Sequence, residues 1–568
     1  MNGRPCASFG RATSWESINW TTARAHVKKL QMRIVKAQKQ GRIGKVKSLQ
    51  WLLTHSFYAK ALAVKQVTEN SGKKTPGIDH DLWQTPQAKY KAITRLHRRG
   101  YQPQPLRRIY IPKKSGKKLR PLGIPAMLDR AMQTLYRYSL EPIAETYADP
   151  NSYGFRIGRS THDAIEQCFN ILSKRKSPKW VLEGDITGCF DHISHEWLLE
   201  NIPMDTEILR KWLKSGYVET QKLFPTEEGT PQGGAISTTL MNLTLDGLER
   251  YLHDQLPDRA TAGKRHFNKI NFVRYADDFI ITGESQDMLE NKVLPLVKIF
   301  LKERGLQLSE EKTLITHIND GLDFLGKNIR MYNNKLLIKP SKTTVKTLLE
   351  KVRTLIKSNP TLKQDALIHR LNPVIRGWVN NQRFVVSSEI FSHVDHEIYK
   401  SLWQWAKRRH KEKSGKWIYN RYFHKIGNRM WTFSVPMETG SKTNNGQPKH
   451  LSLEYATDTK IVRFKKIKAG ANPFDEAWVE YYEEREGEKM THSLKGRNTL
   501  LTLWRKQQRC CPVCGEKLTS ETGFKLHTNT TAGGKTEKIM VHKNCHKKLH
   551  AGNTDSELVL LTEGLSEA

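Results

Sequence analysis

Three aspartates end or interrupt short β-rich runs, a setting that suits the binding of metal ions. Asp277 and Asp278 form a doublet inside the run 272–282, and Asp185 ends the run 180–185. Hard cations such as Mg²⁺ take oxygen ligands, so several carboxylates must converge on one point to hold them. Two such ions, roughly 4 Å apart, can activate an attacking 3′ hydroxyl and hold a triphosphate during nucleotide polymerisation. Because aspartate also caps ordinary turns, the doublet alone makes these residues candidates and no more.

Cysteine and histidine residues near the C-terminus form a second candidate metal site. The chain has seven cysteines, too few and too scattered for a disulfide framework, and four of them lie between residues 510 and 545. Two short pairs have the spacing of a structural zinc site, in which thiolates and imidazole surround one ion tetrahedrally. We therefore expect Zn²⁺ to stabilise the folded tail. The expected ligands are Cys511, Cys514, His542 and Cys545.

The net charge indicates a polyanionic partner. Lysine and arginine number 94 against 57 acidic residues, a formal excess of 37. Residues 89–120 carry twelve of these bases and no acid, and residues 327–429 carry 23 bases and six acids. Aromatic residues are interleaved with both blocks, for example Tyr110 and Trp403. This combination favours nucleic acid over a merely solvated basic surface.

Composition excludes several classes of protein. Hydrophobic residues make up 37% and aromatic residues 9% of the 568 residues, which is typical of a globular chain of several domains. No apolar run is long enough to span a bilayer, so we expect no membrane partner. Residues 1–20 lack the apolar core of a secretory signal, so the expected location is the cytoplasm.

The elements that must position the candidate residues follow from local patterns. Glycine-centred turns separate short β-rich runs at 108–112 and 119–125, which predicts a hairpin with lysines at its tip. Apolar residues at helical spacing between Val345 and Ile356 predict an amphipathic helix. The remaining expectations are helices within 21–70, buried strands at 180–185 and 272–282, basic helices up to about residue 430, and an exposed linker at 439–449.

Seven sequence blocks, in order, resemble the reverse transcriptases, and among these the proteins encoded by bacterial and organellar group II introns. Tyr275-Ala-Asp-Asp278 is similar to the family's catalytic box, and Asp185-Ile-Thr-Gly-Cys-Phe-Asp-His-Ile-Ser-His195 to the box with the third metal ligand. Gly229-Thr-Pro-Gln-Gly-Gly234 is similar to the segment beneath template and primer. The other blocks are 111–125, 152–156, 306–312 and 324–326. The resemblance runs from about residue 20 to the C-terminus.

The resemblance implies roles for single residues of the polymerase part. Asp185, Asp277 and Asp278 would be catalytic and bind two Mg²⁺ ions. Lys113 and Arg120 would pair with the phosphates of a deoxynucleoside triphosphate. Phe190 would exclude a ribose 2′ hydroxyl, its alternative being a packed core phenylalanine, and Gln232 would touch template or nucleotide.

The basic block after the polymerase part resembles the family's thumb and maturase domain. Asn372-Pro-Val-Ile-Arg-Gly-Trp378 is similar to a recurring family element, and the run 407–411 suits phosphate contacts. The resemblance implies that intron RNA is the partner, contacted by Arg376, Lys407, Arg408 and Arg409. Segments 460–468 and 471–474 resemble the family's region that contacts target DNA.

The C-terminal segment resembles the family's His-Asn-His endonuclease but departs from it. His527, His546 and His550 match a possible second metal site in this module. Thr528 stands where the family has a histidine general base, and a threonine hydroxyl cannot act as a base near neutral pH. The family's middle asparagine is also missing. We expect a module that binds zinc and DNA and has lost cutting; the competing interpretation makes His527 itself the base.

The resemblance implies an α+β fold of the right-hand polymerase type, with fingers and an antiparallel palm sheet, a helical thumb, a small DNA-binding region and a zinc-containing ββα-metal-like module. The expected divisions are a flexible tail at 1–20, fingers and palm at 21–340, thumb at 341–430, the DNA-binding region at 431–504 and the zinc module at 505–568.

The function implied is that of an RNA-directed DNA polymerase and maturase of a group II intron. It would assist RNA splicing and copy the inserted intron into DNA during retrohoming, as part of a mobile element, in a prokaryotic cell or an organelle of bacterial origin. A splicing chaperone with an idle polymerase site is the alternative, although the intact carboxylates argue against it. A retron-type or diversity-generating reverse transcriptase is disfavoured by the basic thumb and nuclease-like tail.

Overall fold

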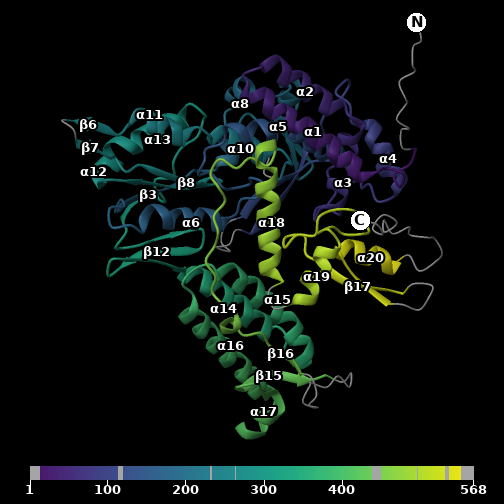
Figure 1. Ribbon diagram of the computed structural model, residues 1–568, viewed down its shortest axis with the longest axis vertical. Coiled ribbons are helices and arrows are strands. Elements are labelled where there is room, and N and C mark those ends of the chain that lie inside the picture. Colours follow the sequence, from purple (N-terminus) through teal and green to yellow (C-terminus); the bar gives the residue numbers. More distant parts are fainter. Residues whose placement is uncertain are drawn as a thin grey trace.

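A computed structural model describes residues 13–112, 119–230, 233–261, 264–437, 450–494, 497–530 and 536–551. Helices and short sheets alternate along the chain, and the thumb projects away from the remaining elements (Figure 1). Lys113, Gln232, the hairpin tip at 114–117 and the linker at 439–449 lie outside the described residues. None of the helices within these ranges is long and apolar enough to cross a membrane.

The N-terminal helices share the main core with the fingers and palm. Asn19 caps the first helix, accepting a hydrogen bond from the amide of Thr22, and Thr85 caps the fourth. Ile18 is buried and Trp15 packs on the same core, so the expected tail at 1–20 includes packed residues from Trp15 onward. Burial of the apolar side chains of Trp15 and Ile18 explains why this part of the expected tail is packed. The helices are α1 (Trp20–Lys39), α2 (Ile43–His55), α3 (Phe57–Glu69), α4 (Pro86–Arg95) and α5 (Met127–Tyr147).

The fingers carry a small sheet with the strand order β2-β1-β4-β5. The expected hairpin is present, since β1 (Leu106–Pro112) pairs antiparallel with β2 (Leu119–Ile124). The partners of this hairpin are β4 (Tyr217–Glu219) and β5 (Lys222–Phe224). The short helices α7 (Cys189–His192), α8 (His195–Asn201) and α9 (Thr206–Leu213) connect the palm to this sheet.

The palm sheet has the order β10-β3-β9-β8, and the acidic residues lie at one end of its central strands. Alternate residues of each strand enter two different cores: Leu182 and Ile281 enter the main core, and Val181 and Ile280 enter a second one against α6 (Thr161–Leu172). Burial on both faces explains the continuous apolar runs in the sequence. The strands are β10 (Leu314–His317), β3 (Trp180–Asp185), β9 (Asp278–Gly283) and β8 (Asn271–Tyr275).

Further elements complete the palm. Helices lie on its main-core side, and a two-stranded ribbon projects from it. The helices are α10 (Ser237–Leu245), α11 (Leu248–Gln255), α12 (Gln286–Met288) and α13 (Leu294–Lys302), with a π-helical turn η1 (Leu289–Val293). The ribbon is β6 (Arg259–Thr261) with β7 (Lys264–His266). A three-stranded sheet, β11 (Leu322–Phe324), β12 (Lys327–Tyr332) and β13 (Lys335–Pro340), leads to the thumb.

The thumb combines four helices with a three-stranded sheet that the sequence analysis did not predict. Phe433 of this sheet and Leu453, which follows its last strand, are buried among the helices. The unit therefore continues past the expected boundary at 430, which falls inside a strand. Its elements are α14 (Lys342–Lys357), α15 (Gln364–Gln382), α16 (Ser388–Arg409), α17 (Gly415–Tyr422), β14 (Phe423–Ile426), β15 (Arg429–Pro436), β16 (His450–Ser452) and the turn η2 (Ala456–Asp458).

Residues 459–478 form a strap that leaves the thumb, crosses the palm at α6 and ends in the turn η3 (Glu476–Trp478). Helix α18 (Val479–Ser493) continues from it into the C-terminal module (Figure 1). Met490 and Trp504 belong to the core of this module, which therefore begins before the expected boundary at 505. The module contains α19 (Asn498–Lys506), β17 (Lys525–Thr530), β18 (Thr536–Val541) and α20 (Lys543–Ala551).

Candidate active site and metal centre

The palm sheet brings the three predicted aspartates together. Strands β3 and β9 pair antiparallel with Asp185 opposite Asp278, and Asp277 lies in the turn between β8 and β9. Asp185 and Asp277 are half-buried and Asp278 is exposed. Burial raises the pKa of Asp277, the nearby carboxylate of Asp185 raises it further, and Arg120 and Lys312 oppose the shift. Crowded carboxylates beside an open edge form a donor set that suits a hard cation.

Lys312 is a part of this site to which the sequence analysis gave no role. Its Nζ donates to Oδ2 of Asp185 at 2.7 Å, and this hydrogen bond raises the pKa of Lys312. The ammonium group therefore partly neutralises the carboxylates in this structure. A cation bound by Asp185 would compete with it for the same oxygen. The block 306–312 was assigned by its order in the sequence, and no local pattern indicated the contact.

The turn that carries Asp277 is held by a fully buried arginine. Arg274 donates to the carbonyl oxygen of Ala276 and to Oδ1 of Asn242, both at 3.2 Å, and forms an ion pair with Asp246. Burial raises the pKa of Asp246 to about 6, although the guanidinium of Arg274 opposes the shift. The sequence analysis gave no role to Asn242 or Asp246, because both belong to the C-terminal end of α10, which is distant in the sequence from this turn.

A close backbone approach fixes the same turn from its other side. Gly154 lies so near the turn that a Cβ atom there would be 2.2 Å from the backbone nitrogen of Ala276. The carbonyl oxygen of Gly154 accepts a hydrogen bond from Nδ2 of Asn242 at 2.9 Å. Ala276 has a φ of 60°, a left-handed conformation that the surrounding contacts must maintain. The block 152–156 thus supports the turn that carries Asp277 through its backbone.

Two of the four predicted nucleotide-binding residues lie within the described chain. Arg120 is exposed on β2, opposite Ile111, and is close enough to influence the charge state of Asp277. Phe190 is half-buried against the main core, and its carbonyl oxygen accepts a hydrogen bond from the amide of Thr230 at 2.6 Å. The predicted template segment therefore contacts the helix α7. Gly233 approaches the carbonyl oxygen of Gly123 in β2, which links this segment to the fingers.

The C-terminal module assembles the predicted zinc ligands. The four candidate ligand atoms of Cys511, Cys514, His542 and Cys545 lie within 4.8 Å of one another. Sγ of Cys514 is 3.3 Å from Nδ1 of His542. Hydrogen bonds to the sulfur atoms of Cys511 and Cys514 raise the pKa of His542 to about 10. Zn²⁺ would displace the protons of these groups, and the donor set fits it.

Three histidines form a second cluster in the same module. His527 extends from β17, and His546 and His550 extend from α20; their ligand nitrogens also lie within 4.8 Å of one another. The ring centroids of His546 and His550 are 4.5 Å apart. Thr528 follows His527 in the strand, so its side chain points to the opposite face. The position at which the resemblance to the endonuclease would place a general base is thus directed away from this cluster.

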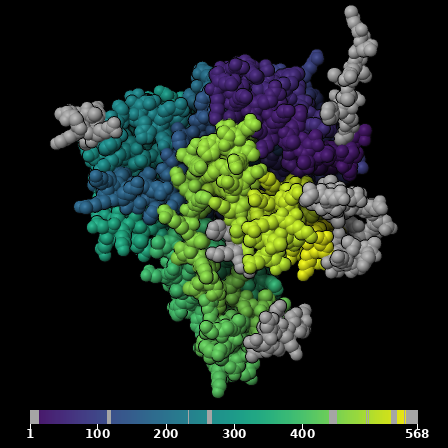
Figure 2. All heavy atoms as spheres, viewed as in Figure 1, coloured from purple at the N-terminus to yellow at the C-terminus, as the bar shows by residue number. Residues whose placement is uncertain are grey.

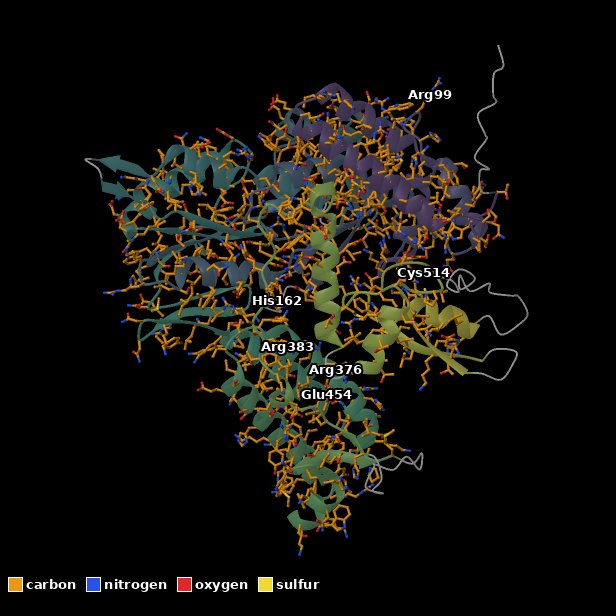
Figure 3. The ribbon with its side chains drawn as sticks, in the orientation of Figure 1. Arg99, His162, Arg376, Arg383, Glu454 and Cys514 are labelled. Carbon is orange, nitrogen blue, oxygen red and sulfur yellow. The ribbon has the colours of Figure 1, made fainter. Side chains whose placement is uncertain are left out.

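Three of the four predicted RNA contacts of the thumb, Arg376, Lys407 and Arg409, have intramolecular partners, and Arg408 lines a cavity of the thumb. Nε of Arg376 donates to both carboxylate oxygens of Glu454 at 2.9 Å, and these two residues lie at the upper end of the thumb (Figure 3). Arg409 donates to the carbonyl oxygens of Pro360 and Leu362, which fixes the loop between α14 and α15. Lys407 lies 5.9 Å above the ring of Trp403.

Comparison with known families agrees with this geometry. Residues 111–329 match the family described as reverse transcriptase (RNA-dependent DNA polymerase), and residues 15–96 match the N-terminal domain of reverse transcriptase. Residues 345–423 match the maturase-specific domain of group II introns. The fold and the site therefore define a reverse transcriptase. The chain belongs to the group II intron reverse transcriptases that carry a maturase domain.

Individual relatives are similar over parts of the chain. The group II intron-encoded protein LtrA of Lactococcus lactis subsp. cremoris is 32% identical over 376 residues, which cover 56% of this chain and 62% of LtrA. Protein YkfC of Escherichia coli (strain K12) is 32% identical over 306 residues, which cover 47% of this chain and 79% of YkfC. The chain thus spans less than two thirds of the length of LtrA. A Candida albicans telomerase structure aligns with a TM-score of 0.32 at 13% identity over 56% of this chain and 64% of that chain, too low to support an argument.

Proposed function

We propose that this protein is an RNA-directed DNA polymerase and maturase that assists splicing of a group II intron RNA and copies the inserted intron into DNA during retrohoming. The observation that carries the proposal is the pairing of Asp185 with Asp278 across β3 and β9, with Asp277 in the adjoining turn. Its partners are intron RNA, target DNA and deoxynucleoside triphosphates.

The residues of the palm and fingers have separate roles in nucleotide addition. When bound by the three aspartates, Mg²⁺ supplies the charge that activates a primer 3′ hydroxyl and neutralises a triphosphate. Arg120 supports the triphosphate from β2, and Lys113 and Gln232, outside the described residues, are assigned by resemblance. Phe190 limits the space for a ribose 2′ hydroxyl. Arg274 and Gly154 keep the turn of Asp277 in place before substrate arrives.

The C-terminal module is proposed to bind zinc and DNA without cutting DNA. Cys511, Cys514, His542 and Cys545 would hold a structural Zn²⁺. The absence of a base at Thr528, whose side chain points away from the histidine cluster, supports the loss of cleavage. His527, His546 and His550 remain available for a second ion. Incubating the zinc-loaded protein with labelled duplex DNA and Mg²⁺ or Mn²⁺ tests this part, and cleavage would overturn it.

Primer extension tests the polymerase. The purified full-length protein is given an annealed RNA template and DNA primer with Mg²⁺ and deoxynucleotides, beside the double variant Asp277→Ala, Asp278→Ala. We expect extension by the parent and a loss of at least roughly 1,000-fold in the variant, since removing charge-stabilising groups at a reacting centre has effects of that order. The variant should bind structured RNA as tightly as the parent.

Lack of extension by a folded parent protein that binds RNA would contradict the proposed polymerase activity. The protein would then be a splicing chaperone with an idle polymerase site. Equal extension by the variant would show that nucleotide addition does not depend on Asp277 and Asp278. Splicing of a precursor RNA containing the intron, measured with both proteins, tests the maturase part separately, since it needs no carboxylate chemistry.

A further inference from the structure

A cavity in the thumb lies apart from the polymerase site and from the zinc module. It has a volume of about 540 Å³ and opens between α14 and the C-terminal end of α16. The loop at 360–361 closes one end of it. This volume lies in the range of cavities that hold small organic ligands, roughly 300–1,000 Å³. The thumb is the lower part of the molecule in Figure 2.

The positive charge of the side chains that line the cavity favours an anionic ligand. Its walls contain four permanent cations and one histidine, and none of the lining residues is acidic. Glu397, which lies outside the lining, binds Arg353 at 2.6 Å and Lys400 at 3.1 Å. A substantial positive charge therefore remains beside the cavity. The charged lining residues are Arg353, Lys357, Arg408, Arg409 and His410.

One wall of the cavity is apolar and rigid. Ile356 and Trp405 are buried beneath it, with 3% and 5% of their surface exposed, and Pro360 borders it. Nε1 of Trp405 donates to the carbonyl oxygen of Asn359 at 3.1 Å. The guanidinium of Arg409 lies 4.6 Å from the Trp405 ring and binds the carbonyl oxygens of the same loop. The wall is thus held in shape before any ligand arrives.

We propose that this cavity binds one unpaired nucleotide that is turned out from folded RNA. The assignment rests on the proposed function insofar as RNA is the partner. An inorganic anion has no need for an apolar wall, whereas a nucleotide combines a flat base with a phosphate. Unpaired bases of RNA are commonly recognised by stacking and by arginine planes. Lys357 and Arg408 contact the phosphate, and Ser401 and Gln404 offer hydrogen-bonding groups to the base or the 2′ hydroxyl.

The test compares two RNA probes with the full-length protein: a short hairpin with one bulged uridine and the same hairpin fully paired. The variant Thr361→Trp fills the cavity from its exposed edge and keeps every charge. Arg408→Ala removes one phosphate contact. Lys351→Ala is the matched control, because Lys351 is exposed on α14 but does not line the cavity.

We expect the parent to prefer the bulged hairpin by roughly tenfold, the scale of one stacked base. Thr361→Trp should remove this preference and leave binding of the paired hairpin unchanged. Arg408→Ala should weaken binding of the bulged hairpin and reduce the slope of log affinity against log salt by about 0.7–0.9. Lys351→Ala should affect both hairpins equally.

Equal affinity of the parent for the two hairpins, or an unchanged preference in Thr361→Trp, would overturn the proposal. Competition by free uridine monophosphate at concentrations as low as those of the bulged hairpin would show a site for free nucleotides, which also overturns it. Primer extension on a simple template is measured in parallel. If the parent lacks extension but keeps the preference, the polymerase claim fails and the cavity assignment stands.

Discussion

The turn that carries Asp277 is fixed by single residues that lie far apart in the sequence. Arg274 holds the turn on one side by donating a hydrogen bond to the carbonyl oxygen of Ala276. From the side, the backbone of Gly154 lies against the same residue. A carboxylate that must bind a metal ion within a few tenths of an ångström depends on such support. The catalytic geometry is therefore sensitive to residues that carry no chemistry.

Gly154→Ala tests this dependence. The added Cβ would lie 2.2 Å from the nitrogen of Ala276, so the turn must shift. A displacement of about 1 Å at a reacting centre can cost roughly 100-fold in rate, and we expect a loss of that order in kcat/KM for primer extension. Affinity for structured RNA should stay within about twofold, since the thumb is untouched.

Gly44→Ala is the control for this substitution. Gly44 lies in α2 with no atom within 4 Å of its added Cβ, and alanine there favours the helix by about 0.5–1 kcal/mol. This variant should retain full activity. Unchanged kcat/KM in Gly154→Ala would show that the turn relaxes without consequence, and the supporting role of this glycine would be wrong.

At the level of elements, the sequence predicted the helices and strands that have a clear local pattern of apolar residues. The strands at 180–185 and 272–282 and the helix beginning near Val345 are confirmed, because their apolar periodicity needs no tertiary information. The sheet of the thumb and the strap at 459–478 were not predicted. Strands β14 and β16 have only four and three residues, and the strap has no strand. These segments depend on partners distant in the sequence, as in the hydrogen bond from the amide of Ile467 to Asp163.

The candidate site also has features that the local sequence predicts and features that only the packing of elements determines. The convergence of Asp185 with Asp277 could be inferred from motif spacing, since each ends or adjoins a strand. The contact of Lys312 with Asp185 and that of Asn242 with Arg274 could not, because nothing in a single sequence shows that these residues meet. Packing of separate elements determines these contacts.

The strap forms a junction with palm and thumb around a histidine. His162 of α6 packs against Phe384, which follows α15, and Phe464 of the strap, with ring-centroid distances of 4.6 and 5.4 Å, and the two phenylalanine rings also contact each other. In Figure 3, His162 and Arg383 mark this junction. Burial lowers the pKa of His162 to about 4, with help from Lys327 and Lys489 and against Asp163. The histidine is therefore neutral in the folded protein near neutral pH.

This depressed pKa predicts acid sensitivity of the junction. Between pH 6.5 and 4 the unfolded chain takes up a proton at this position and the folded chain does not, so the free energy of unfolding falls as the pH falls. The loss at pH 5 should be on the order of 1–2 kcal/mol, since the side chain is partly exposed. His162→Phe, which keeps the ring contacts, should lose less stability than the parent between pH 7 and pH 5 in denaturant unfolding. Equal losses in both proteins would contradict the assignment to His162.

At the scale of the whole molecule, the two ends of the described chain meet. The C-terminal module packs beside the N-terminal helices, as the contact between the yellow and purple regions of Figure 2 shows. Arg24 of α1 forms an ion pair with Glu516 and donates to the carbonyl oxygen of Cys514 at 3.4 Å. Lys28 of α1 and Lys517 line one cavity between these parts. The turn that contacts α1 is thus the turn that carries two candidate zinc ligands.

Removing zinc should therefore loosen the module from the polymerase body. A structural zinc site contributes on the order of 10 kcal/mol to the fold of its turn, whereas a half-exposed ion pair such as Arg24–Glu516 contributes about 0.2–1 kcal/mol. The measurement is the yield of an amine-reactive cross-link between Lys28 and Lys517, with zinc content determined on the same samples. We expect chelation to reduce this yield strongly and Arg24→Ala to reduce it weakly. Arg33→Ala, which removes an exposed arginine from the same helix, should leave it unchanged.

The same measurement separates docking from activity. The module has a core of its own, distinct from the core that supports the palm, so its release should leave the catalytic turn in place. Primer extension on a short template should therefore survive chelation of zinc once Mg²⁺ is restored. If the cross-link yield is unchanged after zinc is shown to be lost, the docking turn is stable without the metal. If extension fails together with docking, the module supports the polymerase through α1, and the two units are not independent.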